Sequence, residues 1–96
     1  MKILKSSQAG SFESSDLMVL IEPVTENSGR KIELDSTVML QYGDDIKTII
    51  IDVLDQFEIS DIHLIAKDKG ALDATIKARL ETAIIRGADL QKGTLI

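Results

Sequence analysis

The sequence contains no cysteine among its 96 residues. A disulfide framework, a cysteine-ligated zinc site and a cysteine nucleophile are therefore excluded. A single histidine, His63, leaves little for a Ser-His-Asp arrangement or a histidine-rich metal site. Only Phe12, Tyr42 and Phe57 are aromatic, so we expect no stacking platform for single-stranded nucleic acid.

Positive charge and long apolar runs are scarce as well. Sixteen Asp and Glu residues against eleven Lys and Arg residues give a formal net charge of −5. This balance argues against a nucleic-acid partner, because phosphate contacts require clustered basic side chains. No apolar run approaches the ~20 residues that span a bilayer, and the apolar part of residues 1–7 is too short for a secretory signal. We expect one cytoplasmic domain over residues 1–96, without a membrane partner.

The apolar patterns predict an α+β fold in the order β-β-α-β-α, with two helices packed on one face of a small sheet. Residues 1–16 are rich in serine and predict a flexible arm, with one short strand around Gly10–Glu13. The apolar run Leu17–Ile21 and the alternating segment Lys31–Asp35 predict two strands joined as a hairpin. A further strand is expected at Ile62–Ala66.

Two amphipathic helices are expected, one after the hairpin and one after the last strand. Apolar residues recur from Ile46 with the 3.6-residue period, and a second helix runs from about Ala71 to Arg86. Charged residues of this second helix, Arg79 among them, are left for solvent. The predicted core consists of the two helical stripes packed against the strands: Ile46, Ile49, Ile50, Val53, Leu54 and Phe57 from the first helix, and Leu72, Ile76 and Leu80 from the second.

The first candidate site is Asp35-Ser36-Thr37, which precedes the first helix. Ordinary phosphopantetheine carriers place their modified serine after an aspartate at a helix start, where the helix dipole favours phosphate. The same residue types also cap helices, and the usual four-helix topology of such carriers is absent. We therefore favour the interpretation that Ser36 caps the first helix.

Acidic residues and the lone histidine supply two weaker candidates. Asp44 and Asp45, with Asp52 and Asp55 on the following turns, are carboxylates of the kind that bind magnesium. No loop with metal-ligand spacing accompanies them, so a solvated helix face is favoured and no metal site is expected. His63 lies in an apolar segment without catalytic partners, which favours a packed or surface histidine.

The third candidate is Glu13-Ser14-Ser15-Asp16, immediately before the first apolar strand. Its composition predicts a polar turn. Ser14 has no base near it in the sequence, and the two flanking carboxylates would repel a phosphate-bearing donor. If Ser14 is modified, a separate enzyme must supply the cations and the base.

Several segments of the chain match one known family at matching distances. They are Ala9-Gly10 through Glu13-Ser14-Ser15-Asp16, the strand to Ile21-Glu22-Pro23, Gln41-Tyr42-Gly43-Asp44-Asp45-Ile46, Asp52-Val53-Leu54, Asp68-Lys69-Gly70-Ala71-Leu72-Asp73 and Ala78-Arg79-Leu80-Glu81. Through them, over essentially the whole chain, the sequence closely resembles the acyl carrier protein (gamma subunit) of citrate lyase. The relatives commonly have Gly where this chain has Ser15.

The resemblance implies a carrier without catalytic residues of its own. It implies that Ser14 bears, through a phosphodiester, a phosphoribosyl dephospho-CoA group, 2'-(5''-phosphoribosyl)-3'-dephospho-CoA, attached by a cofactor transferase (holo-carrier synthase). The thiol of this group carries acetyl and citryl thioesters between the transferase (alpha) and lyase (beta) subunits, which cleave citrate to acetate and oxaloacetate. A chain without cysteine fits this role, because it can perform thioester chemistry only through a borrowed thiol.

Two alternatives to this function stay open. One is the carrier subunit of a related complex of the malonate decarboxylase type, which uses a similar group. The other is a protein-interaction module that carries no prosthetic group at all. The intact mass of the native protein separates the second alternative from the carriers, because an unmodified module has the mass of the bare chain.

Overall fold

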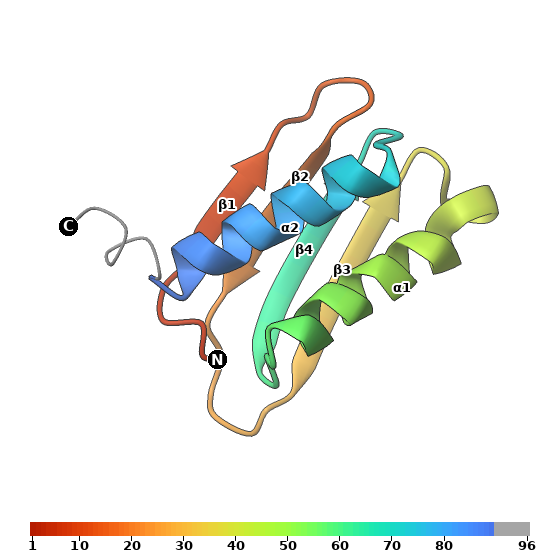
Figure 1. Cartoon of the computed structure of the whole chain (residues 1–96). Helices are drawn as coiled ribbons and strands as arrows, with labels where there is room; N and C mark the ends of the chain where they lie inside the picture. The colour runs from red at the N-terminus through yellow and green to blue at the C-terminus, as the bar shows by residue number, and fades with distance from the viewer. Residues whose placement is uncertain (90–96) are drawn as a thin grey trace.

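A computed structural model describes residues 1–89 of the chain. Its elements are β1 (Ser7–Gly10), β2 (Leu17–Glu22), β3 (Arg30–Ser36), α1 (Met39–Gln56), β4 (Ile62–Asp68) and α2 (Asp73–Gly87). The four strands form one sheet in the order β1-β2-β4-β3. Both helices cover the same face of this sheet, with α2 over β1 and β2 and α1 beside β3 (Figure 1). The predicted α+β class, with two helices on one face, is confirmed.

The element order contains one strand more than the predicted β-β-α-β-α. Within residues 1–16, the short strand lies at Ser7–Gly10 rather than around Gly10–Glu13. Ala9 is buried under α2, and the Ser7 hydroxyl donates a hydrogen bond of 2.6 Å to the carbonyl of Ala83. These contacts with a distant helix hold β1 in place, whereas its own sequence has no strand period.

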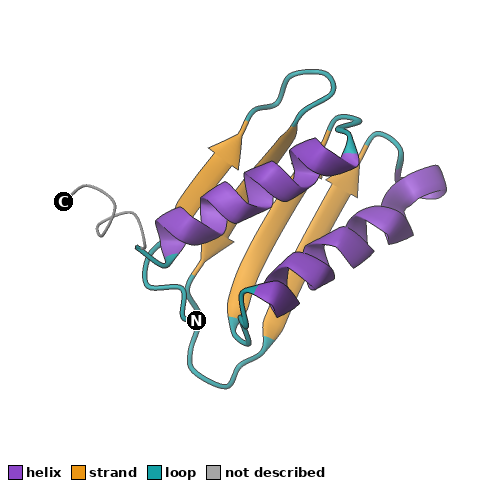
Figure 2. Ribbon diagram, viewed as in Figure 1, coloured by secondary structure: helices purple, strands orange, loops and turns teal. Residues whose placement is uncertain are grey.

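The predicted hairpin between Leu17–Ile21 and Lys31–Asp35 is wrong. β4 lies between these strands, antiparallel to β2 and parallel to β3, so that β2 and β3 do not touch in the sheet (Figure 2). β2 instead forms a hairpin with β1. Because a parallel pair needs a crossover connection, α1 carries the chain from the end of β3 back to the start of β4.

The core lies between the sheet and the two helices. Alternate residues of β2 and β4 face the helices and are buried, as the two-residue period of a strand requires. The largest fully buried side chains are Leu17, Val19, Ile21, Ile50, Val53, Leu54, Ile59, Ile62, Leu64, Ile76, Leu80 and Ile84. The predicted helical stripes are therefore confirmed at most positions, with Ile49 and Phe57 packed at the edge of the core.

Leu72 is the predicted core residue that the structure contradicts. Its side chain is 75% exposed, because α2 begins only at Asp73 and Leu72 precedes it in extended backbone. The helix also continues to Gly87, one residue beyond the predicted end. Residues 90–96, which follow this helix, lie outside the described residues.

The segment before β1 is fastened to the end of α2. The backbone amides of Leu4 and Lys5 both donate to the carbonyl of Gly87, and the Ile3 side chain is buried. A Cβ atom at Gly87 would lie 3.0 Å from the Ser7 hydroxyl oxygen, so glycine allows this close approach. Within residues 1–89, neither helix is long and apolar enough to cross a membrane.

The buried face of α1 gives a test of this packing. We expect Ile50→Ala and Leu54→Ala each to lower the free energy of unfolding by ~2–5 kcal/mol, because both side chains are fully buried and leave cavities. Ile51→Ala is the matched control, since Ile51 is 43% exposed on the opposite face and should cost less than ~1 kcal/mol. Urea unfolding monitored by circular dichroism measures all three. Losses below ~0.5 kcal/mol at both buried positions would contradict the packing.

Candidate functional site

The turn between β1 and β2 presents Ser14 to solvent. Residues 11–16 connect the two antiparallel strands, and Ser14 is exposed near the middle of this segment. Within the described part of the chain the Ser14 hydroxyl has no hydrogen-bond partner. The residues around it are held by several hydrogen bonds, so Ser14 is a free hydroxyl on a fixed support.

Asp16 is the principal anchor of this turn. Its carboxylate accepts two hydrogen bonds from Arg79 of α2, from Nε at 2.9 Å and from Nη2 at 3.0 Å. It also accepts from the Ser11 hydroxyl at 2.6 Å and from the backbone amide of Leu17 at 2.7 Å. These donors, the Arg79 guanidinium first among them, hold the pKa of Asp16 far below its usual value of 3.8. Arg79, predicted to point into solvent, therefore joins α2 to the turn.

A second anchor joins the turn to the loop between β4 and α2. The Ser15 amide donates to the carbonyl of Lys69 at 2.8 Å, and the Lys69 amide donates to the carbonyl of Asp16 at 2.9 Å. The two bonds extend the pairing of β2 with β4 beyond the ends of the strands. Ser14 is thereby held next to the Lys69 loop, more than fifty residues away in the sequence.

Two positions of the turn require unusual backbone conformations. Ser15 has φ of 63°, in the left-handed region that glycine adopts without steric cost. This conformation explains why glycine is the residue expected there in the relatives. Gly10, with φ of 96°, ends β1 so close to β2 that a Cβ atom would lie 1.7 Å from the carbonyl oxygen of Leu17. Only glycine fits there.

Ser36 does not cap α1 as predicted. It is the last residue of β3, whereas α1 begins at Met39 after Val38 and has no side-chain cap. The Ser36 hydroxyl donates to Oδ2 of Asp68 at 2.7 Å and accepts from the Val38 amide at 3.0 Å. Asp68 is 2% exposed and also accepts from the amides of the two residues after Lys69. Ser36 therefore belongs to a structural hydrogen-bond network.

A small cavity of about 250 Å³ lies beside the Ser14 turn. Its lining residues come from three segments: Phe12 from the turn, Asp35 and Ser36 from the end of β3 with Thr37 after it, and Lys67 and Asp68 from the end of β4 with Lys69 after it. We call this the turn cavity. Phe12 is 59% exposed and lies two residues before Ser14. One wall of the turn cavity, Phe12, therefore belongs to the same turn as Ser14.

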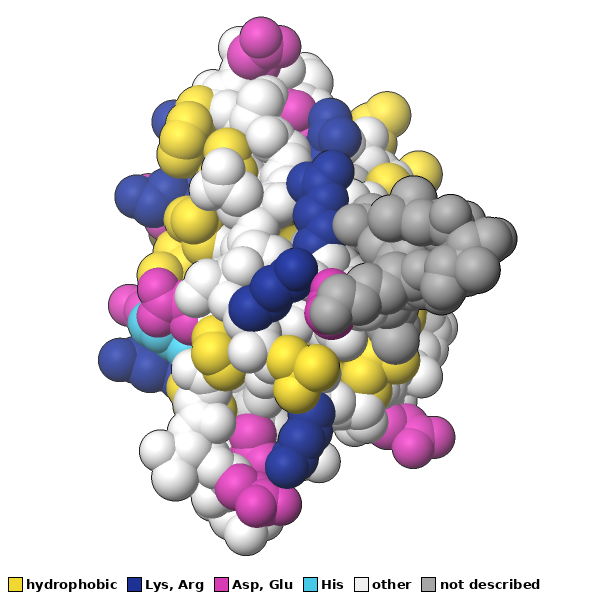
Figure 3. All heavy atoms as spheres, turned by 90° about the vertical axis from the view of Figure 1, so that its left-hand side faces the viewer, with side chains coloured by type: hydrophobic (Ala, Val, Ile, Leu, Met, Phe, Trp, Pro, Cys, Tyr) yellow, Lys and Arg dark blue, Asp and Glu magenta, His cyan; other side chains and the backbone are white. Residues whose placement is uncertain are grey.

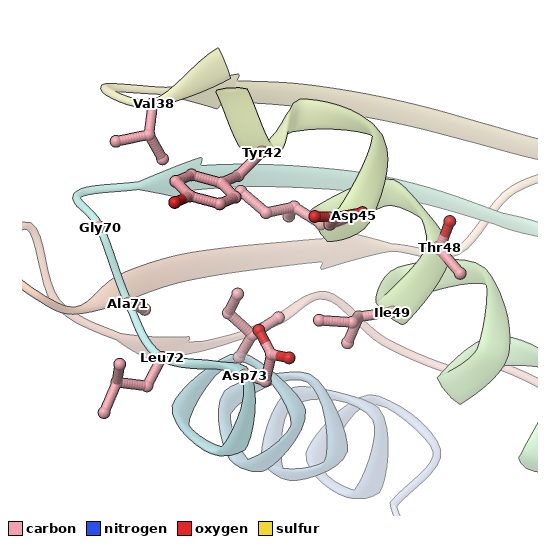
Figure 4. Close-up of a pocket in the computed structure, with 11 residues that line it drawn as sticks. Val38, Tyr42, Asp45, Thr48, Ile49, Gly70, Ala71, Leu72 and Asp73 are labelled. Atoms are coloured by element: carbon pink, nitrogen blue, oxygen red, sulfur yellow. The ribbon is translucent and has the colours of Figure 1, made fainter. Parts of the chain in front are cut away.

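A larger groove of about 750 Å³ separates the first turns of the two helices. Figure 4 shows Tyr42 and Ile49 of α1 facing Leu72 and Asp73 across it, with Gly70 and Ala71 along one wall. Its lining is mainly apolar, and Leu72 and Tyr42 on its rim are 75% and 55% exposed. The loop from Lys69 to Leu72 connects this groove with the Ser14 turn.

The other predicted candidates lie away from the turn. Asp44, Asp45, Asp52 and Asp55 are exposed on α1, which confirms a solvated helix face, and Asp55 pairs with Arg30 of β3. Among residues 1–89, no group of three or more potential ligands could hold a metal ion.

His63 is a partly exposed residue of β4 that contacts two carboxylates of the neighbouring strands. Its Nε2 atom contacts Glu33, and its Nδ1 atom lies 3.5 Å from Glu22. The Glu33 pKa is lowered, mainly by the hydrogen bond with His63. This arrangement confirms a surface histidine.

Charge is mixed on the side of the molecule that carries β1. Figure 3 faces this edge and shows Lys and Arg side chains spread among apolar and acidic ones. Arg86 donates from this region to the carbonyl of Gln8, and Arg79 pairs with Asp16. The net charge of −5 is therefore not expressed as one continuous acidic surface on this edge.

Comparisons with known proteins show which family the chain resembles. The family model described as malonate decarboxylase delta subunit (MdcD) matches residues 4–87. The citrate lyase acyl carrier protein of Edwardsiella ictaluri is 44% identical over 94% of this chain and 91% of its own length. That of Latilactobacillus sakei is 46% identical over 91% of this chain and 84% of its own.

A solved structure shares the fold. A chain in the crystal structure of a Pseudomonas malonate decarboxylase hetero-tetramer in complex with malonate superposes with a TM-score of 0.72, covering 90% of this chain and 87% of that one at 20% identity. The fold and the relatives define a small acyl carrier module. The chain belongs to the family of citrate lyase acyl carrier proteins, as the resemblance predicted.

The structure also brings together residues that sequence reasoning did not connect. Asp16 and Arg79 both lie in segments that carry the family resemblance, yet their pairing across 63 residues was not predicted. The same holds for Lys69, whose backbone fastens the turn. Their positions in matching segments mark these residues as members of the family pattern, but the matches alone do not show which of them lie together.

The left-handed residue of the turn generates a stability prediction. We expect Ser15→Gly to raise the free energy of unfolding by ~0.5–1 kcal/mol, because the relief of left-handed strain exceeds the added flexibility of the unfolded chain. Ser14→Gly is the matched control, since Ser14 has no positive φ and gains only the unfolded-state flexibility. Urea unfolding compares the two. A Ser15→Gly protein less stable than wild type would contradict the assigned backbone conformation.

The Asp16 anchor generates a pH prediction. Because its folded-state pKa is depressed below 3.8, ionised Asp16 stabilises the fold at all pH values above this, and the stabilisation is lost as the pH falls below it. We expect Asp16→Asn to lower the free energy of unfolding by ~1–3 kcal/mol at neutral pH and by progressively less in acid. Urea unfolding over a pH series measures the difference. A deficit that stays constant down to the acid limit would contradict the ion pair as its cause.

Proposed function

We propose that this chain is the carrier subunit of a citrate lyase and that Ser14 holds its phosphoribosyl dephospho-CoA group. The observation that carries the proposal is the Ser14 hydroxyl itself, which is exposed, unbonded within the described residues and supported by a turn fastened to α2 and to the Lys69 loop. The relatives named citrate lyase acyl carrier protein support the type of complex.

The residues around Ser14 fit attachment by a separate enzyme. In the proposed step the Ser14 oxygen bonds to phosphorus of an activated phosphoanhydride, the bond to the departing phosphate breaks, and the hydroxyl proton passes to a base. We assign that base to a cofactor transferase, and Asp16 is not available for the role because its carboxylate is engaged with four donors.

The electrostatic cost of bringing a phosphate to this turn is smaller than two flanking carboxylates would suggest. Arg79 compensates the charge of Asp16 through two hydrogen bonds, which leaves Glu13 as the uncompensated carboxylate next to Ser14. A modifying enzyme therefore has one adjacent negative charge to offset. Exposure of the turn allows it to enter an active site without disturbing the core.

The group supplies a thiol on which acyl groups are carried as thioesters, and the chain has no cysteine that could compete with it. The contribution of the chain is to present this group from a fixed point to two partners in turn, the transferase (alpha) and lyase (beta) subunits. Tethering raises the local concentration of the carried acyl group at both active sites. The carrier itself contributes no catalytic residue.

A carrier of the malonate decarboxylase type is the second candidate. Two similarities favour it: the matching family model is described as a malonate decarboxylase subunit, and the structural neighbour belongs to a malonate decarboxylase hetero-tetramer. The identity of 41–46% with proteins named citrate lyase acyl carrier protein favours citrate lyase over it. Reconstitution with either set of large subunits discriminates the two complexes, since the carrier should support one activity only.

The attachment site is tested by co-expression of the carrier with the cofactor transferase. We expect wild type, Ser15→Ala and Ser36→Ala to gain the mass of the group, and Ser14→Ala to keep the mass of the bare chain. Peptide fragmentation of the modified protein should locate the added mass at Ser14. Ser14→Ala should also abolish lyase activity when it is assembled with the other subunits.

The controls separate loss of the acceptor from loss of the fold. Ser14→Ala changes an exposed side chain without partners among the described residues, so its free energy of unfolding should stay within ~0.5 kcal/mol of wild type. Ser36→Ala should lose ~1 kcal/mol, because it removes two hydrogen bonds, and should still be modified. Modification that survives Ser14→Ala and disappears with Ser15→Ala or Ser36→Ala would overturn the assignment. A bare mass in protein from its native host would favour the interaction module.

A further inference from the structure

We propose that the turn cavity is a nucleotide subsite, which holds the adenosine and phosphate part of the Ser14-linked group when the carrier is not engaged with a partner. This inference rests on the proposed function, because it assigns a place to the group proposed for Ser14. It assigns new roles to Phe12, Lys67 and Lys69.

The turn cavity adjoins the turn that carries Ser14. One wall is Phe12, two residues before Ser14 in the same turn, and another is Lys69, whose carbonyl accepts the hydrogen bond from the Ser15 amide. A group bonded to the Ser14 oxygen therefore starts in the same turn as Phe12 and one residue from the backbone contact with Lys69. Thr37, between β3 and α1, also lines the hollow.

The lining of the turn cavity has the chemistry that recognises nucleotides. Phe12 presents an exposed ring, on which an adenine base can stack. Lys67 and Lys69 are exposed and form no ion pair among residues 1–89, so both ammonium groups are available to phosphates. The Thr37 side chain adds a hydroxyl that can donate to a phosphate or a ribose oxygen.

Two carboxylates, those of Asp35 and Asp68, also line the turn cavity. They differ in how strongly they would repel a bound phosphate. Asp68 is buried and accepts hydrogen bonds from the Ser36 hydroxyl and two backbone amides, so its charge is compensated inside the protein. Asp35 is exposed and lies beside Lys67 in the register of β3 and β4. It opposes a bound phosphate, which gives the subsite one residue whose removal should strengthen binding.

The size of the cavity limits what it can hold. A volume of about 250 Å³ lies below the ~300–1,000 Å³ of typical ligand pockets. The hollow therefore encloses only part of one nucleotide and leaves the long thiol arm outside. Weak intrinsic affinity is sufficient for such a subsite, because a short tether supplies the ligand at a local concentration of about millimolar. Such binding is readily released when a partner subunit captures the arm.

Amide NMR on the unmodified carrier tests this proposal without any lyase activity. Dephospho-CoA is titrated into the ¹⁵N-labelled protein, and pantetheine, which lacks the nucleotide, is titrated as the matched probe. We expect dephospho-CoA to shift the amides of residues 12, 35–37 and 67–69 with saturation in the millimolar range or below, and pantetheine to leave them unchanged. Loading of Ser14 by the transferase should shift the same amides.

The variants identify which side chains are responsible. Phe12→Ala should weaken dephospho-CoA binding about fivefold or more through loss of stacking. The double change Lys67→Gln and Lys69→Gln should weaken it about fivefold, and Asp35→Asn should strengthen it about twofold. Lys77→Gln is the charge control, since Lys77 is exposed on α2 outside the cavity and should change nothing.

Three results would overturn the subsite. They are an equal response to pantetheine, shifts that appear only at the groove between the helices, and an affinity for dephospho-CoA that the double lysine variant does not change. None of them depends on whether Ser14 is the attachment site, because the titration uses unmodified protein. Conversely, a carrier that binds dephospho-CoA in the turn cavity but gains no mass at Ser14 would overturn the proposed function.

Discussion

The ion pair between Asp16 and Arg79 is the interaction on which the geometry of the site depends. This pair bonds α2 to the Ser14 turn, because Arg79 belongs to α2 and Asp16 directly precedes β2. A bidentate carboxylate–guanidinium pair restricts direction as well as distance. The chain therefore presents the Ser14 hydroxyl from a turn that is bonded to α2. Under the function proposed above, the motion that a carrier needs would come from the attached group rather than from the backbone.

Asp68, at the end of the neighbouring strand β4, also joins separate segments through hydrogen bonds to its carboxylate. Leu17, directly after Asp16, stands opposite Asp68 in the register of β2 and β4, so both carboxylates lie at the same end of the sheet. Each uses its oxygens to bind donors from more than one segment. The two carboxylates hold the β1–β2 turn, the end of β3 and the β4–α2 loop close together. This explains why the turn cavity is lined by residues from three distant parts of the chain.

The periodicity of apolar residues predicted the elements whose structure depends on local sequence. It did not predict the strand pairing, which depends on contacts between distant segments. The helices and most of the core followed from stripes such as Ile46, Ile50 and Leu54, because burial of one helix face imposes its own spacing. The predicted hairpin was wrong because the sequences of β2 and β3 do not indicate that β4 lies between them in the sheet. The short strand of residues 1–16 was predicted a few residues too late, and the role of Arg79 was missed, because contacts with distant segments fix both. The proposed role of Ser14 rests on the family resemblance, since the physical properties of an exposed serine in a turn do not indicate modification.

The edges of the sheet bear on how such a protein avoids self-association. β1 is an edge strand of four residues, and Ser7 and Gln8 are already bonded to α2. The other edge, β3, carries the exposed charges of Lys31, Glu33 and Asp35. Short edges and charged edges both resist pairing with a strand of another chain. The two strands that pair on one side only therefore protect the chain from edge-to-edge aggregation with other copies.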